Sequence, residues 1–539
     1  MTRPRLSDRA TAALLTLVVA GGAFLRLWGL QFGLPHPFAR PDEEVVVDLA
    51  LGALKDPNPH FFDWPSLFSY LTAAIYAAMF AAERAVGGAM AGAAAAKAAF
   101  EPALHLVPRV LSAAAGTATI VALYGAVREL CSRRVALTAA ALLAVAFLHV
   151  RDSHFGVTDV PATFLTICGL WAGLRCYTRG ATLSRALAAG ALGGLAATTK
   201  YNCVLVLLPA AIAIVVQPGG SERRRAADVV SLLAALLASA AVAFVAGTPY
   251  ALFDNANFIA AVNGVRRHLS GGHVVMARGW LYHARFTLRY GVGIPLLICA
   301  GAGAGWLVAR DWRKALLVLS FPLSYYLILG SGLTVFARYM IPIVPFLCLL
   351  AAVGIDCVAD ALSSALNRAH LRGAVTAALI VLVMLPTAVA SVTFDRLMTA
   401  TDTRVLAGNW IASTFPSGLS MYQNGLGHAQ TQPRPRERYP QYTFNERTNR
   451  FEAEGGEKAA PDLIVILDSP LTAYTETSAV IGAIVADRYT LIRAFEGAGE
   501  RARPGVVFDQ DDAFFAPYSG MEDVKRPGPN IRVFQRRDK

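Results

Sequence analysis

Apolar residues in this chain gather in long blocks. The blocks are separated by short polar stretches and run over residues 10–30, 66–82, 104–127, 135–150, 160–177, 186–199, 202–217, 228–248, 291–309, 314–330, 340–360 and 373–392. A helix that crosses a bilayer needs about 20 predominantly apolar residues. The pattern therefore predicts a mainly α-helical, polytopic membrane protein. The first block is long and lacks a small-residue cleavage site after it, so we interpret it as a retained span.

Composition supports the same class. Hydrophobic residues make up 55% of the chain and charged residues 16%, against about 25% charged in soluble domains. The formal net charge is +12, which in a soluble protein would indicate a nucleic-acid partner. Here most Lys and Arg lie in short loops between apolar blocks, so the charge indicates orientation in the membrane and no nucleic acid is expected.

The basic loops predict the topology. Arg residues cluster in 1–9, 128–134, 175–185, 223–225 and 310–314, and the positive-inside rule places such loops in the cytoplasm. All of these basic loops lie on the cytoplasmic side only if one apolar block before residue 104 does not span the membrane. Residues 66–82 follow Phe61, Phe62 and Trp64, aromatics that favour an interface, so we assign them to an interfacial or re-entrant helix on the outer side. About eleven spans remain. The N-terminus is then cytoplasmic, and the chain is integral to the cell (inner) membrane.

The chain changes character after residue 392, so we predict two domains, 1–392 in the membrane and 393–539 outside it. Asp402 to Phe415 indicates a helix capped by Asp402 or Thr401. Leu463–Leu467 is an apolar run typical of a buried strand, and Tyr489–Phe495 and Ile531–Phe534 are further strand candidates. These elements predict a small extracytoplasmic α/β domain. The polar stretch 430–456 is expected to be a loop.

Charged residues at the predicted outer face are the candidates for chemistry. Asp42, Glu43 and Glu44 directly follow the first span, and the short outer stretch 151–161 contains Asp152, His154 and Asp159. Carboxylates beside a membrane are costly unless solvated or paired. These stretches could be ordinary solvated loops, or they could converge on one site.

Glycosyl transfer would give these residues a task. A carboxylate can take the proton from an attacking hydroxyl, and cations stabilise a departing phosphate. Cations at the predicted outer ends of spans are Lys200 and Arg338, and Arg267 lies in the loop 249–290. Lys200 and Arg338 could instead simply snorkel to the interface.

Six segments, in order along residues 10–392, resemble the GT-C superfamily of membrane glycosyltransferases. The resemblance is to the protein O-mannosyltransferase and aminoarabinose-transferase group, the family 39-like enzymes. The segments are Asp42-Glu43, HFFDWPSLFSYL at His60–Leu71, VPRVLSAAAGT at Val107–Thr117, DSHFGVTDVP at 152–161, TTKYN at 198–202 and ARYMIPIVPFL at 337–347.

The resemblance implies roles for single residues. It implies Asp42 as the catalytic base, with Glu43 and Asp159 beside it, and Arg338 and Tyr339 facing the donor phosphate. Lys200 and Arg267 are further phosphate-binding candidates. Asp152, His154, His60 and Tyr201 are possible additional members of the site.

The same resemblance implies the reaction and its partners. The donor would be a polyprenyl-phosphate sugar, used with inversion and transferred to a hydroxyl of a glycan, lipid or protein of the cell envelope, among membrane lipids. The mannosyltransferases usually carry a His-Pro-Pro stretch where this chain has Asp63-Trp64-Pro65, and their luminal repeat domain is replaced here by the short tail. These departures leave a protein acceptor, the sugar and the prenyl chain open.

Two points stay open in the sequence. A transporter or flippase of a lipid-linked substrate would also need many spans and charged groups, but its charges would lie near the bilayer midplane. A divalent metal could use Asp42, Asp152 and Asp159. The resembling enzymes are thought not to need one, so we expect no cofactor.

Overall fold

The computed structural model describes residues 7–85, 93–217, 226–272, 277–432, 439–453, 460–497 and 505–537, with side chains from residue 101 onward in the second range. The chain forms two compact units. The first comprises residues 1–28 and 45–392, and the second comprises residues 29–44 and 393–539. The loop that carries Asp42 therefore clusters with the C-terminal residues. The basic residues predicted to orient the chain at 1–6 and 223–225 lie outside the described residues.

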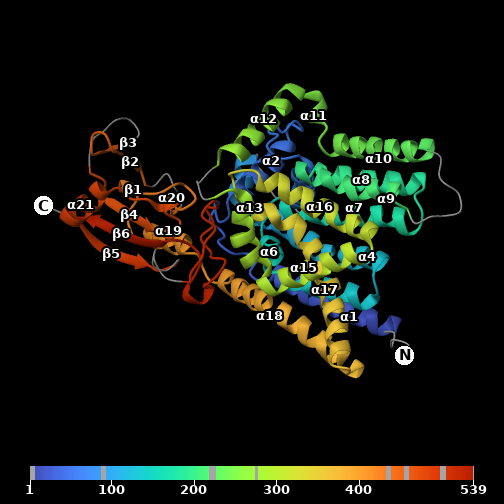
Figure 1. The fold of residues 1–539 in the computed structure, drawn as a ribbon. Coiled ribbons are helices and arrows are strands. Elements are labelled where there is room, and N and C mark those ends of the chain that lie inside the picture. Colours follow the sequence, from blue (N-terminus) through green and yellow to red (C-terminus); the bar gives the residue numbers. More distant parts are fainter. Residues whose placement is uncertain are drawn as a thin grey trace. The chain divides into compact units, whose positions relative to one another are not determined.

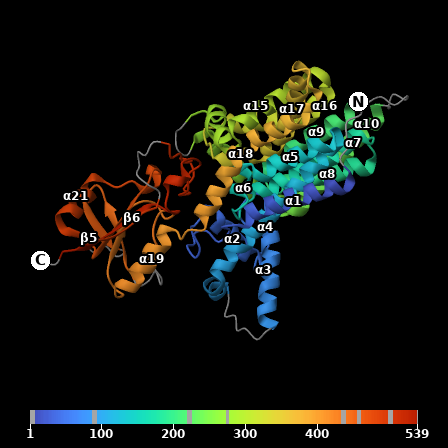
Figure 2. The same cartoon turned by 90° about the horizontal axis from the view of Figure 1, so that it is seen from below.

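The first unit is a bundle of helices, several of which lie side by side in both views (Figures 1 and 2). Its α-helices are α1 (Asp8–Leu27), α2 (Glu43–Ala53, which begins in the second unit), α3 (Leu67–Ala85), α4 (Ala93–Leu130), α5 (Arg133–Val145), α6 (Phe147–Asp152), α7 (Asp159–Thr178), α8 (Leu183–Ala197), α9 (Leu207–Val215), α10 (Ala226–Gly247), α11 (Tyr250–Phe253), α12 (Asn255–Gly271), α13 (Gly279–Tyr282), α14 (Arg289–Val292), α15 (Ile294–Arg310), α16 (Trp312–Gly330), α17 (Val344–Ala365) and α18 (Arg372–Met398, which continues into the second unit). Short irregular helices are η1 (Tyr201–Val206), η2 (His283–Leu288), η3 (Ala337–Ile343) and η4 (Ala369–Leu371).

Within the described ranges, five helical segments have the length and hydropathy of a membrane span, or six if the bent pair α13–α14 with α15 counts as one. They include α1, α10 and the residues 101–130 of α4. The mainly helical body predicted from the apolar blocks is thus confirmed. The count of about eleven spans and the interfacial position of α3 stay predictions.

Glycines allow two helix pairs to approach closely. A Cβ at Gly194 of α8 would collide with the carbonyl of Ala240 in α10, and a Cβ at Gly354 of α17 would collide with the carbonyl of Cys299 in α15. Small residues at such crossings let backbones touch, which is how helices associate in lipid. These contacts fix the scaffold that carries the site.

The second unit contains a six-stranded mixed sheet in the order β3-β2-β1-β4-β6-β5 (Figure 1). The strands are β1 (Met421–Gln423), β2 (Gln441–Asn445), β3 (Arg450–Ala453), β4 (Leu463–Asp468), β5 (Tyr489–Phe495) and β6 (Asn530–Arg536). The helices are α19 (Thr403–Thr414), α20 (Thr472–Thr475) and α21 (Ala479–Arg488), with a short η6 (Met521–Asp523). β1 pairs in parallel with β2 and β4, while β6 is antiparallel to both of its neighbours.

The central strand β4 is buried on both faces. Leu463, Val465 and Leu467 pack with α19, and Ile464 and Ile466 pack with α21. A strand that is buried on both faces needs a continuous run of apolar residues. This run is the pattern from which β4 was predicted.

The α/β fold predicted for the tail is confirmed, and so is its first helix. Asp402 caps α19 by accepting a hydrogen bond from the amide of Arg404 at 2.8 Å. The strands predicted at 489–495 and 531–534 match β5 and β6. The expectation of a loop over 430–456 is wrong within the described residues, because β2 and β3 form an antiparallel hairpin there. Division of the chain into domains at residue 392 stays a prediction.

Candidate functional site

Asp42 lies in a tight turn in the second unit. The amide of Glu43 donates to the carbonyl of Arg40 at 3.4 Å, Pro41 takes the second position, and Asp42 takes the third with φ of +74°. A type II turn has this arrangement and normally places Gly or Asn third. An L-residue held at positive φ stores strain and often marks a functional position. Asp42 is half-buried.

Glu43 and Glu44, the acidic neighbours of Asp42, lie in different surroundings. Glu43 opens α2 with its side chain fully buried. Glu44 is partly exposed and lies 3.1 Å from Nε2 of His428, in the same unit. The adjacent carboxylates therefore do not share one environment.

The first unit brings together Asp159, Lys200 and Tyr339 from separate elements. Asp159 is the first residue of α7, where the positive end of the helix dipole favours an anion. Lys200 follows α8 and its Nζ donates to Asp159 Oδ1. The same Nζ lies 5.1 Å from the centre of the Tyr339 ring, which belongs to η3. With side-chain exposures of 15% for Lys200 and 6% for Asp159, this is a largely desolvated ion pair.

Tyr325 of α16 is a polar group beside this pair that the sequence did not indicate. Its side chain is fully buried, it interacts electrostatically with Asp159 and Tyr339, and its hydroxyl has no hydrogen-bond partner among the described residues. A tyrosine inside an apolar block has the pattern of a core aromatic, so no signal in the sequence separates it. A buried hydroxyl without a partner is available to a ligand oxygen.

Two predicted phosphate-binding arginines lie in different places. Arg338 is half-buried in η3, and its guanidinium stacks over Phe336 at 4.4 Å from the ring centre. Arg267 lies on α12 and lines a cavity of about 450 Å³ together with Asn263, Arg266, Ser270 and Gly271. Two guanidinium groups, those of Arg266 and Arg267, therefore line one hollow of α12.

Asp152 and His154 sit in a buried polar layer. Arg151 contacts Asp152 at 3.1 Å and lies 5.0 Å from the centre of the Phe155 ring. The ring nitrogens of His154 lie 3.0 Å from the Val150 carbonyl and 2.9 Å from the Trp28 carbonyl. Because both nitrogens face backbone oxygens, His154 has the geometry of a structural residue.

His60 lies in the segment between α2 and α3 of the first unit, and Tyr201 is the first residue of η1. His60 is exposed and lies 3.2 Å from Asp56 and 3.6 Å from Asp254. Hydrogen bonds from Asn58 and then Asn257 hold the pKa of Asp254 below its usual value. The Tyr201 hydroxyl donates to the Phe62 carbonyl at 2.9 Å. These contacts tie the loop 56–62 to neighbouring elements.

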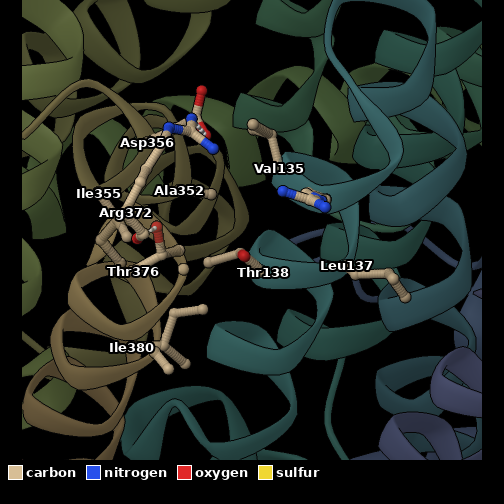
Figure 3. A pocket seen from close by; sticks show the side chains of 12 residues that line it. Val135, Leu137, Thr138, Ala352, Ile355, Asp356, Arg372, Thr376 and Ile380 are labelled. Carbon is tan, nitrogen blue, oxygen red and sulfur yellow. Dashed lines mark hydrogen bonds and ion pairs between the residues drawn. The ribbon is translucent and has the colours of Figure 1, made fainter. Parts of the chain in front are cut away.

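A cavity of about 380 Å³ is lined by residues of α5, α17 and α18 (Figure 3), and none of the predicted site residues lines it. Its lining is mostly aliphatic, and Arg372 reaches Asp356 at 2.6 Å at one end. Arg134, at the start of α5, belongs to a basic cluster predicted to be cytoplasmic, so this cavity is not part of the predicted outer site.

A metal site would need several ligands close together. Among the residues that the structure describes, no group of three His, Cys, Asp or Glu side chains is arranged to hold one.

Comparison with known proteins yields one family match and several structural matches. The family model of dolichyl-phosphate-mannose-protein mannosyltransferases matches residues 103–247. This stretch contains Asp152, Asp159, Lys200 and Tyr201 and leaves out Asp42 and Arg338. No curated protein matches the sequence.

The solved structures share the fold at low identity. ArnT from Cupriavidus metallidurans in the apo state has a TM-score of 0.54 at 15% identity, over 97% of this chain and 98% of that one. ArnT bound to undecaprenyl phosphate has a TM-score of 0.51 at 17% identity, over 82% and 87%. The apo oligosaccharyltransferase of Archaeoglobus fulgidus has a TM-score of 0.53 at 14% identity, over 90% and 70%.

Proposed function

We propose that this chain, which has the GT-C fold of membrane glycosyltransferases, transfers a sugar from a polyprenyl-phosphate donor to an acceptor hydroxyl. The observation that carries the proposal is the backbone of Asp42, a carboxylate held at positive φ in a turn that Gly or Asn would normally occupy. Such strain is retained when the side chain is needed. The matches to the mannosyltransferase model and to ArnT supply the reaction class.

In the proposed reaction, Asp42 takes the proton from the acceptor hydroxyl as its oxygen attacks the anomeric carbon. The bond from that carbon to the phosphate oxygen breaks, and the lipid phosphate leaves with the electron pair, so the configuration inverts. Lys200 and Arg338 would stabilise the charge that grows on the phosphate. Asp159 would keep Lys200 in place until the phosphate competes for it.

The other predicted residues would have supporting tasks. Tyr339 would orient the ammonium of Lys200 through its ring, and Arg267 would attract the anionic head group before it binds. Glu43 is the rival base. The outer face of the inner membrane is the proposed site of the reaction, with residues 393–539 outside the membrane.

The test is a donor panel. Purified protein is incubated with polyprenyl-phosphate sugars and envelope extract as acceptor source, and released lipid phosphate is measured. We expect release with at least one donor. Asn fits the positive-φ turn as well as Asp does, so Asp42→Asn removes only the carboxylate and should lower turnover by about 10²–10⁴-fold with donor binding retained.

Two outcomes would contradict this assignment. If Glu43→Gln abolishes turnover and Asp42→Asn does not, Glu43 is the base. If wild-type protein releases phosphate from no donor, glycosyl transfer itself is wrong.

A further inference from the structure

We propose that the C-terminal residues of the second unit, 393–539, position the turn Arg40–Glu43. Arg404 is the positioning residue, and it holds the backbone that leads to Asp42. This inference rests on the proposed function for its catalytic meaning. The contacts that carry it all lie within the second unit and stand independently of it.

Arg404 is itself rigidly fixed. It is the second residue of α19, and the carboxylate of Asp402 binds its guanidinium at two points, Nε to Oδ1 at 2.9 Å and Nη2 to Oδ2 at 2.7 Å. The pair is buried, with side-chain exposures of 2% and 1%. The Phe515 ring lies 5.3 Å from the guanidinium carbon and closes the other side. A bidentate, stacked and buried guanidinium has one orientation.

The remaining donors of Arg404 bind the first loop, which is the segment 28–42 between α1 and α2. Nη1 donates to the carbonyl of Phe38 at 3.1 Å, and Nη2 donates to the carbonyl of Ala39 at 3.3 Å. Nη1 also donates to the carbonyl of His428. One side chain therefore joins the first loop to two segments of the C-terminal residues. Phe38 and Ala39 come just before the turn Arg40–Glu43.

Further contacts hold both sides of the turn. Arg40, fully buried, contacts Asp512 at 2.9 Å and lies 5.5 Å from the centre of the Phe514 ring. On the far side of Asp42, Glu44 contacts His428. Residues on either side of Asp42 are thus anchored to side chains more than 380 positions later in the sequence.

This anchoring explains how the strained turn survives. A non-glycine residue at positive φ persists only where its surroundings over-determine it. A base must also stand within a fraction of an ångström of its productive position. Arg404 supplies a rigid reference for the carbonyls beside the turn. Residues 393–539 therefore position the proposed base through the turn that carries it.

The experiment compares variants in the full-length protein. Arg404→Lys keeps a charge beside Asp402 but cannot hold both loop carbonyls. The neutral pair Asp402→Asn with Arg404→Gln avoids leaving a buried charge if the first variant folds poorly. Arg493→Ala is the matched control: Arg493 is exposed, stacks on Trp410 and Phe495 of the same unit, and makes none of the contacts with residues 29–44 described above.

Two readouts are measured, hydrogen exchange by peptide and steady-state kinetics. For both Arg404 variants we expect exchange in peptides covering 30–44 to rise about tenfold while that of 463–468 stays unchanged. We also expect kcat to fall at least about tenfold at unchanged donor KM. The control should match wild type in both.

Each failure has its own meaning. Unchanged exchange in 30–44 for both Arg404 variants, or kcat equal to that of the control, overturns the positioning role. Absence of transfer in the wild type would overturn the proposed function, and the exchange result would still decide whether Arg404 anchors the loop.

Discussion

Asp42 was predicted as a site residue because it follows the first predicted span. The structure shows in addition that its backbone has a positive φ. Its positive φ could not be predicted, because Arg-Pro-Asp-Glu is compatible with several turns and only the tertiary contacts of residues 36–44 select this one. Asp159, Lys200 and Tyr339 were predicted singly from three segments. That they meet depends on how α7, α8 and η3 pack, which no local pattern encodes. Tyr325 was missed for the same reason.

Arg338 carries the prediction about donor binding. Its guanidinium stacks on the ring of Phe336. We expect Arg338→Ala to raise the donor KM about ten- to hundredfold, since hydrogen bonds to charged groups contribute about 1.5–3 kcal/mol. Arg289→Ala, an exposed arginine of α14 stacked on Tyr290, is the control. Donor kinetics equal in the two variants would remove Arg338 from the site and leave Lys200 as the principal cation.

At the scale of elements, continuous apolar runs were predicted well and half-exposed elements poorly. The run at 463–467 could only be a strand covered on both faces or a short buried helix, and its flanking Pro and Asp residues favoured the strand. The hairpin of β2 and β3 was taken for a loop because its residues are mostly polar or partly exposed. A strand of this kind at the edge of a sheet is stabilised by pairing rather than by an apolar pattern.

Helix α3 carries the prediction about topology. If residues 66–82 do not span, the loop between α4 and α5 is cytoplasmic and α12 is on the outer side. In a background without the seven native cysteines, an impermeant thiol reagent added outside intact cells should label a cysteine placed at Ser270 and spare one placed at Ser132. Labelling of position 132 before permeabilisation would mean that α3 crosses the membrane.

At the scale of the molecule, the second unit should lose stability in alkali. Burial raises the pKa of Tyr489 to about 12, and its hydroxyl donates to the Pro461 carbonyl at 2.7 Å. A pKa raised in the folded state gives a stabilising contribution that is complete below the unfolded value of 10.0 and is lost as pH rises through about 12.

Denaturation of the wild type and of Tyr489→Phe, measured between pH about 10 and about 12, tests this loss of stability. We expect the wild type to become less stable as pH rises from about 10 to about 12, and the variant to decline less steeply. Tyr422, with a pKa also raised to about 12 by burial, should account for part of the remaining slope. Parallel profiles for the two proteins would show that Tyr489 is not the group responsible.

The membership of residues 29–44 in the C-terminal unit has a practical consequence for chimaeras. An exchange of tails between relatives that crosses over only near residue 392 would separate Arg404 from Phe38 and Ala39, and Arg40 from Asp512. Such a hybrid should misplace Asp42, the proposed base, even though every proposed site residue is present. A transplant that also carries residues 29–44 from the tail's donor keeps these partners together. The first loop and the tail therefore form one exchangeable cassette, encoded in two pieces.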